Sequence, residues 1–204
     1  MAYRLISSGD LSDVLMLADV KKHIKILHDV EDYEIEAYLK SSVDRVQRIT
    51  KVALVTQTWK YTTDCWPDDY LIHLEQSPVT SVTHVKYYDE DGVQQTLATT
   101  KYQTDLTSMP ARVYITDVPA LETGIGRIEI QFVTGPLDVV PEDLLHAIRM
   151  FTAGFYCDRL EGGKRAGSQV SSADRYMTAA EQICKQYSAD RKSTRLNSSH
   201  ESPS

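Results

Sequence analysis

The sequence has little cysteine and no long apolar run. Its three cysteines, Cys65, Cys157 and Cys184, lie far apart and form no C-x-x-C pair, which argues against a disulfide framework and against a cysteine-rich zinc site. The apolar run from Val14 to Ala18 is far shorter than the roughly 20 residues of a membrane span, and no signal-peptide pattern precedes it. We therefore expect reduced thiols and a soluble, intracellular protein that makes no membrane contact.

Positive charge is also scarce. The 204 residues contain 22 Lys and Arg against 29 Asp and Glu, for a formal net charge of -7. This balance argues against a basic protein that grips nucleic acid through its phosphates. Hydrophobic residues make up 42% and charged residues 25% of the chain, which is ordinary globular usage, so the chain can bury a core.

The end of the sequence differs in character from the rest. Residues 190–200 read DRKSTRLNSSH, which is a forward translation of a common short-read sequencing adapter. We predict that 190–204 is a non-native, adapter-derived tail, disordered by composition, and that the native carboxyl terminus differs from the one printed. The tail carries three cations and two acids, so residues 1–189, which we expect to form a single domain, have a net charge of -8.

Helical periodicity marks both ends of residues 1–189. Apolar residues at spacings of three and four predict a short helix from Leu17 and a long helix over 32–50 with Asp32 as its cap. A third helix should start at Pro141 and end near Asp158. A Gly-rich linker over 161–168 should precede a last helix that Ser172 caps. The predicted helical segments are 17–52 and 141–187.

Between these segments the apolar period changes to two. Six short runs rich in β-branched and aromatic residues, separated by turn residues, predict strands at 55–61, 70–74, 82–88, 93–97, 112–115 and 127–133. The Asp89–Gly92 turn predicts a hairpin. We expect an α+β fold, in which a helical bundle from the N- and C-terminal helices carries an inserted antiparallel β-sheet, sandwich or small barrel over 53–135.

Signatures of catalysis and of metal or cofactor binding are missing from the sequence. It has no G-x-S-x-G elbow and no glycine-rich phosphate loop. Two pairs at the i, i+4 spacing of a helix, Asp19 with His23 and Glu142 with His146, fit ion pairs better than metal ligands, because no third ligand is spaced to join them. We expect no catalytic, cofactor-binding or metal-binding residues, and no enzyme activity.

A series of short stretches along the chain, in a characteristic order and spacing, carries a resemblance to a known family. They are residues 17–24, 29–36, 54–59, 78–82, 85–92, 130–135 and 140–144, followed by the helix to Phe155 and Tyr156. Together they resemble the head-tail connector (adaptor) proteins of tailed bacteriophages and prophages, in the longer branch whose helical bundle is interrupted by a β-rich insert. The segment after Gly163 matches that family only as a linker and a helix.

The resemblance implies a structural component of the virion, made in the cytoplasm of the bacterial host, with a part in virion assembly and DNA packaging. Such a protein forms a homo-oligomeric ring beneath the portal protein and offers a surface to the stopper or tail-completion protein. The acidic balance would let phage DNA pass through without being bound. Ring neighbours would meet through the long helices, which gives the possible interface residues Ile35, Leu39, Val43, Phe151, Phe155 and Tyr156.

Two other interpretations remain open. One is a small enzyme or ligand-binding domain that uses the β insert as its pocket, around Trp59, Trp66 and Tyr70. The other is a phage stopper or tail-completion protein, which the helix-rich ends of the chain disfavour.

Overall fold

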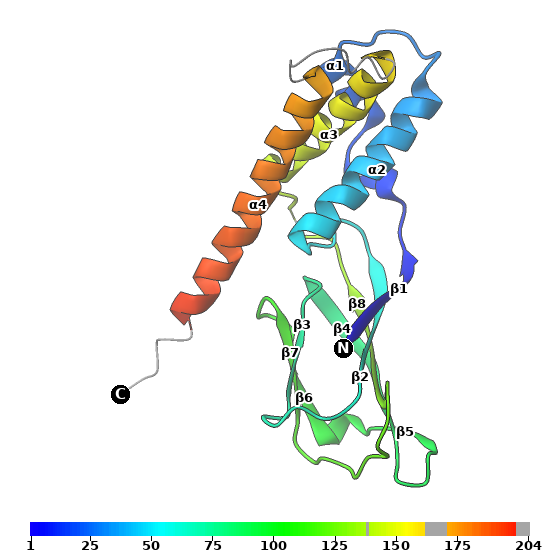
Figure 1. The fold of residues 1–204 in the computed structure, drawn as a ribbon, viewed down its shortest axis with the longest axis vertical. Helices are drawn as coiled ribbons and strands as arrows, with labels where there is room; N and C mark the ends of the chain where they lie inside the picture. Colours follow the sequence, from blue (N-terminus) through cyan, green and yellow to red (C-terminus); the bar gives the residue numbers. More distant parts are fainter. Residues whose placement is uncertain (138, 162–170, 199–204) are drawn as a thin grey trace. The chain divides into compact units, whose positions relative to one another are not determined.

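Two compact units make up the chain (Figure 1). The computed structural model describes residues 1–137, 139–161 and 171–198. A β unit consists of 1–9 and 55–137, and a helical unit consists of 10–54 and the chain from 138 onward. Helices and antiparallel sheets thus occur in separate parts of the sequence, and the predicted α+β class is confirmed. The single domain predicted for 1–189 stays a prediction.

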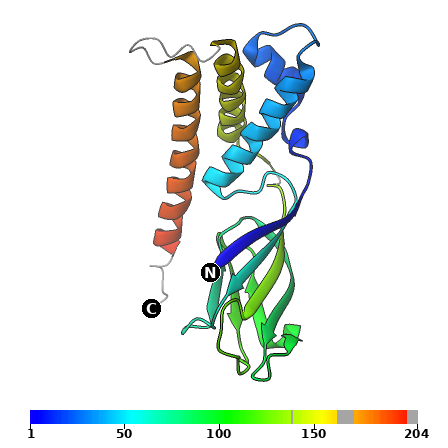
Figure 2. The same ribbon diagram turned by 45° about the vertical axis from the view of Figure 1, so that its right-hand side comes forward.

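The described residues of the helical unit form four α-helices and a short 3-10 helix, Leu11–Val14. α2 packs against both α3 and α4, α3 packs along α4, and α1 covers α2 and α3 (Figure 2). None of the helices in the described part of the chain has the length and apolar content needed to cross a membrane. The bounds are Leu17–Ile24 for α1, Asp32–Thr50 for α2, Glu142–Glu161 for α3 and Ser172–Ser198 for α4.

The ends of these helices differ in detail from the prediction. Asp32 is not the cap of α2, since Glu31 takes the cap position without a side-chain bond and Asp32 instead accepts a hydrogen bond from Lys21 Nζ at 2.6 Å. Ser172 does not cap α4, because the hydroxyl of Ser171 accepts the N–H of Asp174 at 3.0 Å. α4 continues to Ser198, so helix covers part of the tail predicted to be disordered. The predicted linker, apart from Glu161, and residues 199–204 lie outside the described residues.

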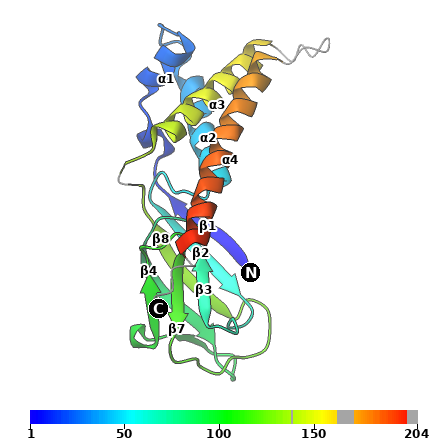
Figure 3. The same ribbon diagram turned by 90° about the vertical axis from the view of Figure 1, so that its left-hand side faces the viewer.

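The β unit is a sandwich of two antiparallel sheets. The larger sheet has the order β1-β2-β8-β4-β5 and the smaller has the order β3-β7-β6; Figure 3 shows β3 beside β7. Strand bounds are Ala2–Ser8 (β1), Gln57–Thr63 (β2), Leu71–Leu74 (β3), Val79–Tyr88 (β4), Gln94–Thr96 (β5), Tyr102–Asp105 (β6), Ala111–Ile115 (β7) and Ile128–Thr134 (β8), with a 3-10 turn at Thr99–Lys101. Of the sheet, sandwich and barrel considered, the structure has the sandwich.

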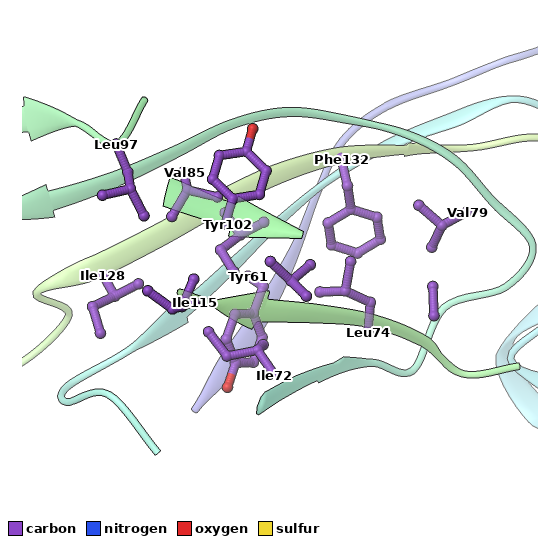
Figure 4. Packing of buried hydrophobic residues seen from close by; sticks show 13 residues of the cluster. Tyr61, Ile72, Leu74, Val79, Val85, Leu97, Tyr102, Ile115, Ile128 and Phe132 are labelled. Atoms are coloured by element: carbon purple, nitrogen blue, oxygen red, sulfur yellow. The ribbon is translucent and has the colours of Figure 1, made fainter. Parts of the chain in front are cut away.

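The sandwich core is filled by alternating residues from both sheets (Figure 4). Phe132 of β8 and Leu74 of β3 are fully buried and face one another across the core. Ile128 of β8 and Ile115 of β7 are buried in the same way and lie near one another. Along β8 every second residue is buried, which is the period of two on which the strand prediction rested. The predicted hairpin at Asp89–Gly92 is confirmed by the antiparallel pairing of β4 with β5.

Two strands were not predicted from the sequence, β1 and β6. β1 pairs antiparallel with β2 and brings the amino-terminal segment into the β unit, so this unit is larger than the predicted insert over 53–135. Along β1 only Tyr3 is partly buried. An alternation of buried and exposed residues is therefore too weak in this segment to mark a strand.

Candidate functional site

Four of the six predicted interface residues lie in the interior of the helical unit. Ile35, Leu39 and Val43 on α2 and Phe151 on α3 have 0% exposure. Their spacing of four places the α2 residues on one face, and the other helices of the unit cover that face. These buried side chains offer no surface to a second protein. They could contribute to a ring only indirectly, by holding the helices in position. Their interface role stays a prediction.

The other two predicted interface residues, Phe155 and Tyr156 on α3, are partly exposed. The Phe155 ring stacks on that of Tyr38, with centroids 6.1 Å apart. The Tyr156 hydroxyl donates to Glu31 Oε2 at 2.8 Å, and this hydrogen bond, with burial, raises the pKa of Tyr156. Glu31 also pairs with Arg159 at 3.4 Å. This link between the start of α2 and the end of α3 was not predicted from the sequence.

Phe155 also lines a hollow of about 570 Å³ on the helical unit. Charged side chains of α2 and α4 surround it and are paired with one another. Arg45 Nη2 bonds Glu181 Oε1 at 2.6 Å, and Arg48 pairs with Asp44. The Arg45 bond holds the pKa of the Glu181 carboxyl below its ordinary value, although burial works against it. The charged side chains around this hollow are therefore already paired, and its lining residues include no base placed beside a nucleophile.

A second hollow, of about 590 Å³, lies in the β unit and is lined by Trp66 and Tyr70, two of the three residues proposed for a ligand pocket. Trp59 does not line it, and its Nε1 instead donates to Gln57 Oε1 at 3.0 Å. Two polar side chains of this hollow are bonded to the backbone: Trp66 Nε1 donates to the carbonyl of Pro119 at 3.2 Å, and Asp64 accepts the N–H of Gly126 at 2.7 Å. The hollow therefore offers a partly apolar surface without a catalytic set.

A half-buried acid, Glu129, lies on the larger sheet between two basic side chains. Lys60 Nζ contacts Glu129 Oε2 at 2.8 Å, and His84 Nε2 lies 3.4 Å from Oε1. Burial alone would raise the pKa of this carboxyl, but the hydrogen bonds and charges of Lys60 and His84 outweigh it, and the pKa is lowered. These contacts tie β2, β8 and β4 together and leave Glu129 no free oxygen for acid-base chemistry.

The two i, i+4 pairs singled out in the sequence do not form the expected ion pairs. Asp19 pairs with Lys22 at 3.5 Å, and Glu142 pairs with Arg149 at 2.6 Å. The structure instead brings the two histidines of these pairs together, with the rings of His23 and His146 edge-on and 6.2 Å apart. Burial, then the charges of His146 and Arg149, lower the pKa of His23. Across the described residues no three His, Cys, Asp or Glu side chains gather to hold a metal ion.

The three thiols should differ sharply in reactivity. Cys65 is exposed, whereas Cys184 is fully buried and burial raises the pKa of its thiol to about 11. Because the thiolate is the reactive form, we expect iodoacetamide to label Cys65 of the folded protein at least about tenfold faster than Cys184. Peptide mass spectrometry after timed labelling measures both rates. Equal labelling of the two in the folded protein would contradict the burial of Cys184, and the unfolded chain is the control.

Comparison with known proteins finds similar folds among solved structures. One chain of the neck of an empty GTA particle, computed with C6 symmetry, has a TM-score of 0.66 and 19% identity, over 92% of this chain and 95% of that one. A chain of the virion of a native gene transfer agent (GTA) particle has a TM-score of 0.67 and 20% identity, over 92% and 95%. A chain of the neck of a native GTA particle, computed with C12 symmetry, has a TM-score of 0.63 and 20% identity, over 91% and 95%. No family model and no curated protein matches the chain.

Proposed function

We propose that this chain is a structural component at the neck of a tailed phage or phage-like particle, where it acts as a head-tail connector. It forms a homo-oligomeric ring beneath a portal protein, surrounds the channel for DNA, and offers its other side to a stopper or tail-completion protein. The observation that carries this proposal is the likeness of fold to neck chains of GTA particles, which extends over 92% of this chain and 95% of one of those chains. A likeness of that extent includes both the helical unit and the β unit.

The charges of the chain support the same proposal. Residues 1–189 have a net charge of -8, and much of the basic charge is used in ion pairs, such as Arg45 with Glu181 and Lys60 with Glu129. A ring with this balance does not hold the phosphates of DNA that moves through it. In the first hollow Arg45 is bonded to Glu181, and in the second Trp66 and Asp64 are bonded to backbone atoms, so neither hollow favours an enzyme as a second candidate function.

We expect the purified chain to assemble into rings when mixed with the portal protein encoded near it. Native mass spectrometry and electron microscopy of the mixture should show many copies of the chain on each portal ring, because a cyclic particle offers each copy the same contact. The chain alone is the control, since the portal can be required as a template. A chain that stays monomeric beside an intact portal ring would contradict the proposal, as would metabolic genes in place of capsid, portal and tail genes around its reading frame.

A further inference from the structure

The larger sheet of the β unit ends in two different edges, β1 on one side and β5 on the other. β1 is an edge strand with Leu5 43% and Ile6 47% exposed. Its pairing with β2 shifts register between Leu5 and Ser7, so Ile6 lies in a bulge. An edge strand presents a row of backbone N–H and C=O groups on its outer side, and proteins usually cover or block a long edge of this kind. β1 therefore has the features of a strand that another chain covers.

The β1 edge carries an uncommitted cation, Arg4. Arg4 is exposed and lies opposite Lys60 of β2 in the sheet register. Lys60 is bonded to Glu129, but Arg4 has no ion-pair partner among the described residues. Three more cations of the β unit are paired, Lys101 with Asp117 at 2.7 Å, Arg127 with Glu122 at 2.9 Å, and Arg112 with Asp105. Lys86 of β4 also has no ion-pair partner among the described residues, but it is partly buried, whereas Arg4 is exposed. Arg4 is therefore available to an acidic group from outside the chain.

The opposite edge of the same sheet, at the β4–β5 hairpin, carries exposed acidic side chains. Asp89 at the end of the β4–β5 hairpin is used within the loop, where it accepts the N–H of Val93 and the amide of Gln95, each at 2.8 Å. These bonds lower the pKa of Asp89 and fix the loop. Glu90 and Asp91 are exposed and have no ion-pair partner among the described residues. Val93 beside them is 54% exposed.

We propose that β1 of one copy lies beside the β4–β5 hairpin of the next copy, so that the larger sheets of neighbouring copies meet edge to edge. Arg4 then pairs with Glu90 and Asp91, while the exposed Leu5 and Ile6 lie against Val93. The two surfaces are different and lie on opposite edges of one sheet, which is what a head-to-tail contact repeated around a ring requires. This inference rests on the proposed ring and assigns one of its contacts; the occupant of the β1 edge is a second copy of this chain.

A charge-swap experiment on portal-templated rings tests the contact. Arg4→Glu places like charges together, so we expect the concentration for half-assembly to rise by about tenfold or more. The hairpin variant Glu90→Arg with Asp91→Arg should be impaired to a similar extent, and the triple variant should regain most of the wild-type assembly. Lys25→Glu, at an exposed cation, makes the same charge change in the other unit and should assemble normally. Circular dichroism checks that every variant is folded.

The possible outcomes separate this inference from the proposed function. Rings of wild-type protein together with unimpaired Arg4→Glu and hairpin variants would overturn the edge-to-edge contact and leave the connector function standing. Impaired single-edge variants that the triple variant does not rescue would also overturn it, because Arg4 would then face the portal, DNA or another protein. Failure of the wild-type chain to form rings would contradict the proposed function itself.

Discussion

Replacing Phe151 with alanine is expected to lower the free energy of unfolding of the helical unit by about 3 to 5 kcal/mol. Phe151 is fully buried, and the guanidinium of Arg45 lies over its ring, 4.8 Å from the centroid. The substitution leaves a cavity in a packed interior and removes a cation–π contact. Urea unfolding followed by the far-ultraviolet circular dichroism of the helices measures the change, because the α-helices belong to the helical unit among the described residues.

Tyr33→Ala is the matched control for this substitution. Tyr33 is an aromatic residue of α2 in the same unit, but it is 83% exposed, so its loss should change the free energy of unfolding by no more than about 0.5 kcal/mol. A Phe151→Ala protein that unfolds at the wild-type urea concentration but fails to join a ring would contradict the assignment of Phe151 to the core. Phe151 would then be an interface residue, as the sequence predicted, rather than a core residue.

Helices were the best predicted part of the fold, because their apolar residues form one continuous stripe. For α2 the prediction over 32–50 agrees with the structure at both ends. There the apolar spacing runs without a break from Ile35 to Ile49, and Lys51, with a φ of 58°, leaves the helical conformation. The caps were predicted less well, since a capping bond depends on where one side chain points. The Asp32 side chain accepts a hydrogen bond from Lys21 of α1 and does not cap its own helix.

Most strands were predicted where one face is buried, and β1 was missed where that contrast is weak. β5, whose three residues are all exposed, was predicted with the help of the hairpin turn before it. β8 alternates buried and partly exposed residues along its whole length and was found. β1 is held by pairing with β2 and by one partly buried residue, Tyr3, whose hydroxyl donates to the carbonyl of His73 at 3.0 Å. That contact joins residues far apart in the chain, and no local pattern of apolar residues reports it.

The candidate site shows a second limit of sequence patterns. Periodicity marks the apolar face of a helix, but a face covered by the same chain and a face covered by a neighbour have the same pattern. Because the two kinds of face look alike in the sequence, most of the α2 and α3 residues predicted as interface residues proved to be core residues. Arg4 was not chosen, because a lone cation near the amino terminus has no distinguishing pattern. Its proposed role rests on the edge position of β1 and on its exposure without an ion pair, whereas Lys60 and Arg127 of the same unit are paired.

Replacing Phe132 with alanine should destabilise the β unit by about 3 to 5 kcal/mol and leave the helical unit unchanged. Phe132 is fully buried in the sandwich core, and its ring meets that of Tyr3 edge-on at 6.5 Å, so its loss also weakens the packing of β1. The chain has two tryptophans, Trp59 and Trp66, and both belong to the β unit. Tryptophan fluorescence therefore follows unfolding of the β unit, while far-ultraviolet circular dichroism of the helices follows the helical unit in the same urea titration.

We expect the fluorescence transition of Phe132→Ala to move to lower urea and the helical transition to stay at its wild-type position, because each unit has a buried core of its own. Ile125→Ala, at an exposed position of the β unit, should move neither transition and is the control. If Phe132→Ala instead moves both transitions together, the two units unfold as one cooperative structure. The single domain predicted from the sequence for residues 1–189 would then describe the chain better than two independent units.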